Sequence, residues 1–324
     1  HELLLADPAV DLLVIGQPTS HFAAESAEDI VALAAEATKP VVALWTGRHA
    51  NASAHARLRA VRVPLFEQAD LCYRSIGSVL RLVEYRQKRA RARAAGPPPI
   101  DQARRAEALR LCQAAADVRS EHESKRLLAL YNIPAPEECV VRNANEAVAA
   151  ADRLGYPVVV KAHGRALRHK SEHDAVRLGL GDAPAVATAY TAVTRGAGVA
   201  EALVAKMAPA GLELILGLTR DPQVGLLLLV GIGGIFVEVF RDVAFAVPPL
   251  WPGEAEELLS RLRGAALLEG ARGRPPLDRQ AAVAAIEALS VLAAELDDAL
   301  EQVDVNPLIV GPAGTGAWAA DGLV

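Results

Sequence analysis

The Gly-Pro-Pro-Pro run at residues 96–99 divides the chain into two parts with different patterns of apolar residues. Upstream of this run, short apolar stretches at residues 11–16, 39–45 and 63–66 alternate with stretches of helical periodicity at 26–37, 50–59 and from 69 onward. Strands that alternate with helices in this way pair in parallel, because each helix crosses over from one strand to the next. Residues 1–95 are therefore expected to form an α/β domain with a doubly wound parallel sheet.

The part downstream of the proline run has a mixed pattern. Residues 96–119 combine a stiff, extended proline segment with a connecting helix at 101–116. Ser120 and Glu123 have the spacing of a capping box and predict the start of the next helix. Residues 120–324 then predict strands at 139–142, 157–162, 175–180, 202–207, 212–218, 226–230, 302–310 and 316–321, and helices at 145–154, 184–194, 254–263 and 278–296. Clustered antiparallel strands with flanking helices predict two α+β lobes around a cleft.

Composition narrows the class of protein. The chain has 324 residues, is 52% hydrophobic and 23% charged, and carries a formal net charge of -5, which predicts a folded, soluble protein without a nucleic-acid-binding surface. No apolar run reaches the roughly 20 residues that a membrane span needs. The three cysteines include no Cys-x-x-Cys pair, so we expect neither a disulfide framework nor a zinc site, and a cytoplasmic location. The chain begins at His1 and its only methionine is Met207, so we expect a fragment of a longer polypeptide.

Lys161 is the first candidate for ligand binding. It ends the apolar run that begins at residue 157, and no acid lies near it in the sequence. A buried ammonium group is costly unless an anion pairs with it, so the expected partner is a nucleotide phosphate. A surface lysine that extends its amine into solvent is the alternative.

His169 lies between two basic residues, Arg168 and Lys170. Their positive charge favours the neutral imidazole, which is the nucleophilic form, and stabilises a phosphorylated ring. His169 is therefore a candidate to receive a phosphoryl group. His163 and His173 are close in sequence, so a group of solvated histidines is the alternative, and their spacing matches no compact zinc pattern.

A glycine-rich segment precedes a further acid. Gly231, Gly233 and Gly234 come shortly before Glu238. Glycines let backbone amides approach phosphate oxygens, and the acid can hold the magnesium ion that accompanies them. A hairpin turn followed by an exposed acid is the alternative.

Oxygen ligands for magnesium are also predicted near the end of the chain. Asp304 and Asn306 lie on one face of a strand, because side chains alternate with a period of two. Asp321 adds a further oxygen if its strand pairs with that one, whereas a turn-capping role before proline is the alternative for Asn306. Arg272, beside Gly273, is a secondary candidate for phosphate, although an exposed loop arginine is more common.

These segments occur in the order found in the ATP-grasp part of the ADP-forming acyl-CoA synthetases, relatives of succinyl-CoA synthetase. The stretches that resemble the family's motifs are Glu123-Ser124-Lys125-Arg126-Leu127-Leu128, Tyr131-Asn132-Ile133-Pro134, His169-Lys170-Ser171-Glu172, Arg220-Asp221-Pro222-Gln223, Gly231 to Glu238, and Asp304-Val305-Asn306-Pro307-Leu308. The first part is similar to the small flavodoxin-like CoA-ligase domain of fused bacterial members. The resemblance implies a truncated flavodoxin-like domain at 1–95, a linker and connecting helix at 96–119, and a two-lobed ATP-grasp domain at 120–324.

The resemblance implies an enzyme that converts an acid, CoA and ATP reversibly to acyl-CoA, ADP and phosphate. The reaction of the family passes through an acyl phosphate and a phosphohistidine, and His169 resembles the histidine that accepts phosphate near the nucleotide. Matching positions imply nucleotide binding by Lys161, Met207, Gly233, Gly234 and Arg272, and magnesium binding by Glu238, Asp304, Asn306 and Asp321. CoA and the acyl group are expected to bind mostly to upstream CoA-binding and phosphohistidine domains of the same polypeptide, and a homo-oligomer is expected.

Some positions depart from the family's motifs and leave other functions open. The chain has Asp174-Ala175 where the family has two glycines, and Lys206 where it has glutamate. A regulatory nucleotide-binding module, like those fused to protein acetyltransferases, is therefore an alternative. A carboxylate ligase that forms an amide without a histidine intermediate is a further alternative, which the flavodoxin-like part and the His169 segment argue against.

Overall fold

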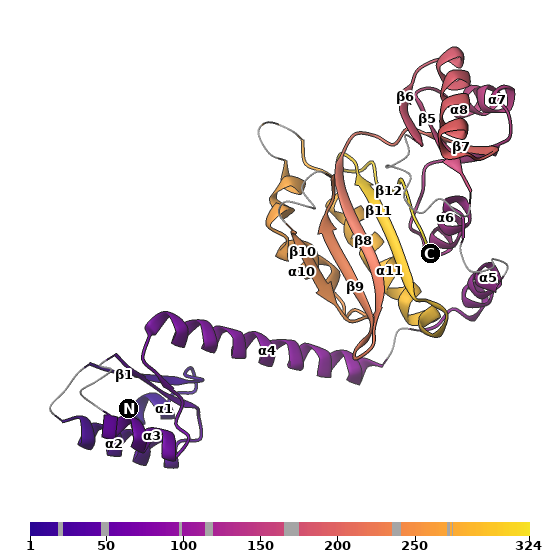
Figure 1. The fold of residues 1–324 in the computed structure, drawn as a ribbon. Helices are drawn as coiled ribbons and strands as arrows, with labels where there is room; N and C mark the ends of the chain where they lie inside the picture. Colours follow the sequence, from indigo (N-terminus) through magenta and orange to yellow (C-terminus); the bar gives the residue numbers. More distant parts are fainter. Residues whose placement is uncertain are drawn as a thin grey trace. The chain divides into compact units, whose positions relative to one another are not determined.

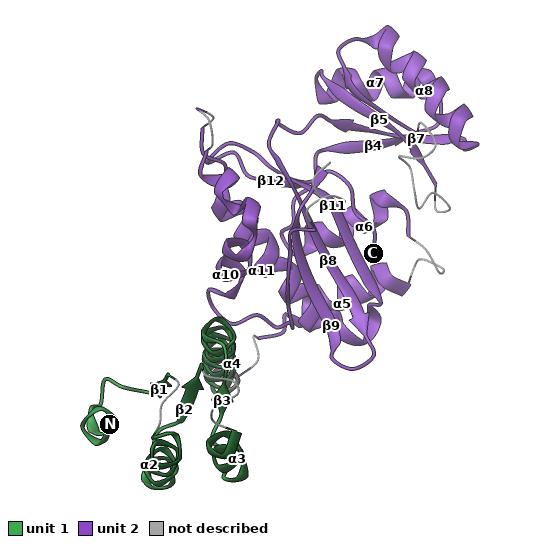
Figure 2. Ribbon diagram, turned by 60° about the vertical axis from the view of Figure 1, so that its left-hand side comes forward, with its two compact units in different colours: residues 1–94 green, residues 95–324 purple. Residues whose placement is uncertain are grey.

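The computed structural model describes residues 1–18, 22–46, 52–96, 99–113, 119–164, 175–234, 241–270, 273 and 275–324. The chain forms two compact units, His1–Ala94 and Ala95–Val324, which Figure 2 colours separately. Within the described ranges, no helix combines the length and apolar character needed to cross a membrane.

The first unit has an α/β fold, as the alternating pattern predicts. Its elements are α1 (Glu2–Ala6), β1 (Leu13–Gln17), α2 (Ala23–Glu36), β2 (Val41–Trp45), α3 (Ala52–Ala60), β3 (Leu65–Phe66) and α4 (Ala69–Ala95). The three strands pair in parallel in the order β1-β2-β3, so the described strands run in sequential order. Parallel pairing requires a crossover between strands, which α2 and α3 provide.

Helices cover both faces of this three-stranded sheet. On one face, Ile15 and Ala43 share a core with Ile30 of α2 and Leu58 of α3. On the other face, Leu44 of β2 is in the same buried cluster as Cys72 of α4. Both faces of a parallel sheet must be covered because both carry apolar side chains.

The second unit contains a four-stranded sheet, which we call the small lobe together with its two helices. The strands β4 (Glu138–Val141), β5 (Val158–His163), β6 (Val176–Leu180) and β7 (Glu201–Lys206) are paired antiparallel in the order β4-β7-β5-β6. Asn143 and Asp182 cap the helices α7 (Ala144–Leu154) and α8 (Ala183–Ala197). Figure 1 shows α7 and α8 beside this sheet at one end of the second unit.

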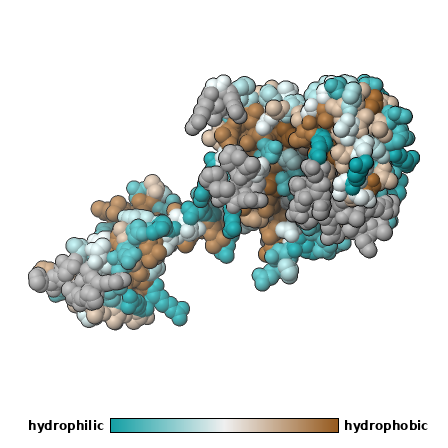
Figure 3. All heavy atoms as spheres, turned by 45° about the horizontal axis from the view of Figure 1, so that its top comes forward, coloured by the Kyte–Doolittle hydropathy of each residue, from teal (hydrophilic) through white to brown (hydrophobic). Residues whose placement is uncertain are grey.

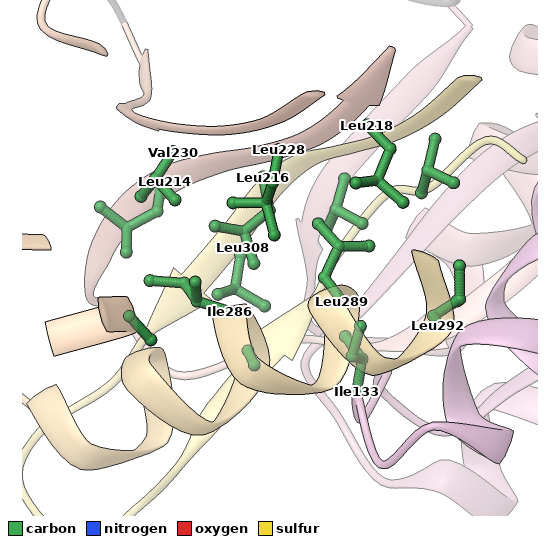
Figure 4. Close-up of a cluster of buried hydrophobic side chains, with 14 of the residues drawn as sticks. Ile133, Leu214, Leu216, Leu218, Leu228, Val230, Ile286, Leu289, Leu292 and Leu308 are labelled. Atoms are coloured by element: carbon green, nitrogen blue, oxygen red, sulfur yellow. The ribbon is translucent and has the colours of Figure 1, made fainter. Parts of the chain in front are cut away.

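A five-stranded antiparallel sheet forms the large lobe. Its order is β10-β9-β8-β11-β12, with β8 (Leu212–Asp221), β9 (Gly225–Ile232), β10 (Val243–Ala246), β11 (Gln302–Val310) and β12 (Ala317–Ala319). The helical elements are α10 (Glu254–Arg261), η3 (Arg263–Glu269), α11 (Arg279–Leu296) and η4 (Asp297–Ala299). Figure 4 shows side chains of α11, among them Ile286 and Leu289, pointing toward Leu216 and Leu308 on the strands. Antiparallel sheets in two lobes are what the sequence predicts, and that prediction is confirmed.

Two helices connect the linker to the large lobe. Glu295 of α11 binds Arg104 of α5 (Gln102–Gln113), with Oε1 2.6 Å from the guanidinium Nη2. Leu127 and Leu128 of α6 (Glu121–Leu130) are buried in the large-lobe core. The Ser120 hydroxyl and the Glu123 carboxylate form both hydrogen bonds of the predicted capping box, so this prediction is confirmed.

The strand β10 was not predicted from the sequence. Ala244 and Ala246 are buried in the large-lobe core, whereas Val243 and Phe245 are 38% and 50% exposed. The strand therefore carries its larger apolar side chains on the surface and its smallest ones inside, which hides the usual apolar signal. Hydrophobic residues at the surface are brown in Figure 3.

Candidate functional site

Lys161 lies inside strand β5 and not at its end, because β5 continues to His163. Val158, Val160 and Ala162 are buried in the small-lobe core. Since side chains alternate along a strand, Lys161 lies on the opposite face of the small sheet. The Lys161 side chain is nevertheless only 9% exposed.

The amine of Lys161 has partners within the chain. Its Nζ donates to Glu121 Oε1 at 2.8 Å and to the carbonyl oxygen of Ala320 at 2.8 Å, and Asp321 Oδ2 lies 4.0 Å away. The sequence argument considered only acids near Lys161 in the sequence, whereas its carboxylate partner Glu121 is 40 positions away. The carboxylate of Glu121 therefore already balances the charge of the buried Lys161 amine.

Glu121 belongs to a wider buried network. Its Oε1 also accepts a hydrogen bond from Lys125 Nζ at 2.5 Å, and Lys125 Nζ donates to Glu138 Oε2 at 3.0 Å. His122 Nδ1 lies 2.9 Å from Glu138 Oε1. The side chains of Glu121, Lys125 and Glu138 are 2%, 3% and 7% exposed. We call Glu121, His122, Lys125, Glu138 and Lys161 the interlobe network.

Charge pairing outweighs burial in this network. Burial lowers the pKa of the Lys125 ammonium, but the carboxylates of Glu121 and Glu138 raise it more, so the net shift is upward. Burial raises the pKa of Glu138, but the hydrogen bond from His122 and the charge of Lys125 lower it more, so the net shift is downward. Lys125 and Glu138 are therefore both charged near neutral pH.

The interlobe network joins the two lobes of the second unit. Glu121, His122 and Lys125 lie on α6, whose apolar face packs in the large-lobe core. Their partners Glu138 and Lys161 lie on β4 and β5 of the small lobe. The boundary between the lobes therefore holds a buried amine, that of Lys161, fixed by groups from the other lobe.

Asp304 and Asn306 are on the face of β11 that points away from the large-lobe core, as the two-residue period predicts. Val305 lies between them and Val303 precedes Asp304, and both valines are buried. Asp304 is half-buried and Asn306 is exposed. The strands β11 and β12 pair antiparallel, and after β12 a bridge between Asp304 and Leu323 keeps the chain beside β11. Asp321 is close enough for its charge to act on Asp304. Burial, together with the negative charge of Asp321, raises the pKa of Asp304.

The chemistry of these oxygen atoms fits a magnesium ion. Two carboxylates that repel each other are a favourable pair for a hard divalent cation, which removes the repulsion when it binds. Within the described residues, no three His, Cys, Asp or Glu side chains are grouped closely enough to hold a metal. Asp304 and Asp321 would thus provide protein ligands beside phosphate oxygens and water, the usual arrangement for magnesium. Glu238 lies outside the described residues.

The glycines at the end of β9 have structural reasons to be glycine. A Cβ at Gly231 would lie 2.9 Å from a methyl carbon of Val243. A Cβ at Gly233 would lie 2.9 Å from the backbone oxygen of Glu213, to which the Gly233 amide already donates at 2.7 Å. Gly234 has a φ of 69°, in the left-handed region that favours glycine. Close packing and backbone conformation therefore explain the glycines at these positions.

Met207 lies in the connection between the lobes. It follows β7 of the small lobe and precedes β8 of the large lobe, and the residue is 37% exposed. Lys206, the last residue of β7, is also exposed. An exposed apolar side chain at such a connection can pack against a ligand that binds between the lobes.

The structure thus brings Lys161 and Asp321 together and places Asp304 near Asp321. His169, Glu238 and Arg272 lie outside the described residues. Sequence reasoning missed Glu121 and Lys125 as members of the site. A signal was present, because Glu121, Lys125 and Leu128 follow one another at spacings of four and three, which places them along one side of α6, and all three are buried.

Comparisons with known proteins agree with this geometry. Residues 110–324 match the family model of an ATP-grasp domain. The β subunit of the ADP-forming acetate–CoA ligase II of Pyrococcus furiosus is 33% identical over 208 residues, which are 62% of this chain and 88% of that subunit. A trans-feruloyl-CoA synthase from an unknown prokaryotic organism is 33% identical over 277 residues, which are 82% of this chain and 37% of that enzyme. The aligned region of this chain is longer than the segment 110–324, so the similarity to this enzyme extends upstream of residue 110.

A solved structure of a relative includes ligands. The dinucleotide-forming acetyl-coenzyme A synthetase 1 of Ca. Korarchaeum cryptofilum aligns with a TM-score of 0.57 and 33% identity, over 68% of this chain and 98% of that chain. That structure holds coenzyme A and Mg-AMPPCP, and its phosphohistidine segment points towards the nucleotide binding site. By its sequence and its fold, the chain belongs to the family of ADP-forming acyl-CoA synthetases and carries their ATP-grasp domain.

Proposed function

We propose that this chain binds ATP and magnesium and transfers a phosphoryl group within an ADP-forming acyl-CoA synthetase. The overall reaction is acid, CoA and ATP to acyl-CoA, ADP and phosphate, in either direction. The observation that carries the proposal is the buried amine of Lys161 at the boundary of the lobes, 4.0 Å from Asp321, which in turn lies near Asp304. The lysine ammonium group can bind phosphate oxygens, and the carboxylate pair can bind magnesium. A site for a magnesium nucleotide requires both.

Lys161 binds the nucleotide phosphates in this proposal. An ammonium group has three N–H donors, and two of them bind Glu121 and the Ala320 oxygen. Among the described residues the third N–H has no hydrogen-bond partner, and in this proposal it donates to a phosphate oxygen. Met207 packs against the base, and the backbone at Gly233 and Gly234, with Arg272, contacts the phosphates.

Oxygen atoms of Asp304, Asn306, Asp321 and Glu238 hold magnesium in this proposal. When bound, the ion reduces the charge repulsion between phosphate oxygens and an approaching nucleophile. The raised pKa of Asp304 follows from burial and from the charge of Asp321, and a cation at this pair lowers that pKa again.

His169 is the nucleophile. A nitrogen lone pair of the neutral imidazole attacks the γ-phosphorus of ATP, an N–P bond forms, and the bond from phosphorus to the bridging oxygen breaks. ADP leaves with the electrons of that bond. In the Korarchaeum enzyme the phosphohistidine segment points towards the nucleotide binding site, which supports phosphoryl transfer between nucleotide and histidine.

CoA and the acyl group bind mainly outside this chain in our proposal. The Pyrococcus relative is named as a β subunit, and the feruloyl-CoA synthase is longer than the region it shares with this chain. The remaining parts are thus either a companion subunit or further domains of the same polypeptide. We assign residues 1–95 to a flavodoxin-like CoA-ligase domain, 96–119 to a linker with a connecting helix, and 120–324 to the ATP-grasp domain.

The proposal is tested by restoring the whole reaction. The chain is combined with the CoA-binding and phosphohistidine domains of a relative, and ADP release is followed with acetate or another short acid, CoA and Mg·ATP. We expect thioester and ADP in equal amounts, and loss of both with His169→Ala. Wild-type turnover by His169→Ala would remove the histidine step.

A regulatory module is the second candidate. The exposed Lys206, which replaces a glutamate of the family, favours it, because the change alters a polar group beside the proposed base contact at Met207. Tight binding of Mg·ATP with no phosphoryl transfer in the combined assay would favour the regulatory function.

A further inference from the structure

The carboxylate of Glu121 restrains Lys161 from the opposite lobe. Its oxygen Oε1 accepts hydrogen bonds from Lys161 Nζ at 2.8 Å and from Lys125 Nζ at 2.5 Å. The Ala320 oxygen accepts a second bond from Lys161, also at 2.8 Å. The donors of an ammonium group are tetrahedral, so two fixed acceptors determine the direction of its third N–H.

We propose that Glu121 is a positioning residue for phosphate binding: it fixes the amine of Lys161 so that the third N–H points to the nucleotide phosphate. The inference rests on the proposed function, in which Lys161 binds that phosphate. Glu121 itself does not touch the nucleotide. Without this restraint, the four-carbon side chain of Lys161 would lose rotational freedom on binding, which weakens the contact.

Positioning and simple electrostatics predict opposite effects. Glu121 is negatively charged and lies beside Lys161, the residue that binds the negatively charged phosphate in the proposed function. If only charge mattered, removal of this carboxylate would strengthen phosphate binding. If Glu121 positions the amine, its removal weakens phosphate binding although the local charge becomes more positive.

Two substitutions separate these effects. Glu121→Asp keeps the charge but withdraws the carboxylate by one methylene group, whereas Glu121→Gln removes the charge but keeps an acceptor. Glu295→Gln is the matched control, since Glu295 is likewise 2% exposed and bound to a cation, Arg104 on α5. Glu121→Asp retains the charge balance of the network, so it tests the inference even if Glu121→Gln fails to fold.

The experiment measures calorimetric dissociation constants of the full chain for Mg·ADP and for adenosine. The ratio of the adenosine constant to the Mg·ADP constant reports the contribution of the phosphates. We expect Lys161→Met to lower this ratio by about tenfold or more, as for a hydrogen bond between charged groups. We expect both Glu121 variants to lower it by roughly 3- to 10-fold, and Glu295→Gln to leave it unchanged.

A double variant shows whether Glu121 acts through Lys161. In a Lys161→Met background, Glu121→Asp should have no further effect on the ratio, whereas a merely structural role would lower it again. An unchanged or increased ratio in the single Glu121→Asp variant would overturn the inference, and so would an additive effect in the double variant. If wild type binds Mg·ADP no more tightly than adenosine, or if Lys161→Met has no effect, the proposed role of Lys161 fails first.

Discussion

Replacement of Glu121 by leucine should destabilise the second unit more than replacement of Lys125 by methionine. Glu121→Leu leaves two buried ammonium groups without their shared carboxylate oxygen. Lys125 would keep Glu138 at 3.0 Å, but among the described residues Lys161 would keep only the Ala320 oxygen and Asp321 at 4.0 Å. Loss of one partner from a buried pair costs about 3 to 5 kcal/mol, so we expect a loss in this range.

Lys125→Met has a smaller expected cost because each carboxylate keeps a partner. Glu121 retains Lys161 at 2.8 Å, and Glu138 retains His122 at 2.9 Å. We expect a loss of about 1.5 to 3 kcal/mol, near that of one hydrogen bond to a charged group. The difference between the two variants is then about 2 kcal/mol, which is well within the reach of denaturant titration.

The assay is equilibrium unfolding in urea, followed by tryptophan fluorescence. Trp45 is in the first unit, whereas Trp251 and Trp318 are in the second. A Trp45→Phe background therefore makes the signal specific for the second unit. Glu287→Leu is the control, since Glu287 is exposed on α11 and its replacement should change the free energy of unfolding by less than about 0.5 kcal/mol. If Glu121→Leu costs no more than Lys125→Met, the shared-carboxylate reasoning is refuted.

Two further predictions concern the carboxylate pair and the glycines. Burial and the charge of Asp321 raise the pKa of Asp304, so the folded state binds its proton more tightly than the unfolded state. Without magnesium, stability should therefore fall as pH rises from the ordinary carboxyl pKa through the raised one. Asp304→Asn should abolish that part of the pH dependence and also the stabilisation by Mg·ADP; thermal unfolding from pH 4 to 7 with and without Mg·ADP measures both. Gly233→Ala should cost about 1 to 3 kcal/mol, because the new Cβ would meet the backbone of Glu213 at 2.9 Å. A Gly233→Ala variant as stable as wild type in urea would contradict the packing seen here.

Periodicity was sufficient for most of the fold, because the patterns of helices and strands are local. The period-two burial of Leu214, Leu216 and Leu218 and the capping box at Ser120 both follow from residues a few positions apart. The short strand β10 was not predicted because its buried residues are alanines, which contribute little to the apolar pattern of the sequence.

The candidate site could be predicted only in part. The common face of Asp304 and Asn306 follows from strand geometry, and the pairing of β11 with β12 brings Asp321 near, as anticipated. The partner of Lys161 could not be found in this way, because Glu121 reaches it across 40 positions and from another lobe. For the same reason, the close contact between Gly233 and the backbone of Glu213 could not be predicted, and phosphate binding by Gly233 stays a prediction.

The most direct test of the central claim is phosphoryl transfer to His169. The full chain is incubated with magnesium and ATP labelled at the γ-phosphorus, and the labelled peptide is identified by mass spectrometry at alkaline pH, where phosphohistidine survives. The account predicts label on His169, its loss in His169→Ala, and its return to ADP as ATP. Label-free His169 in a chain that demonstrably binds Mg·ATP would contradict the account.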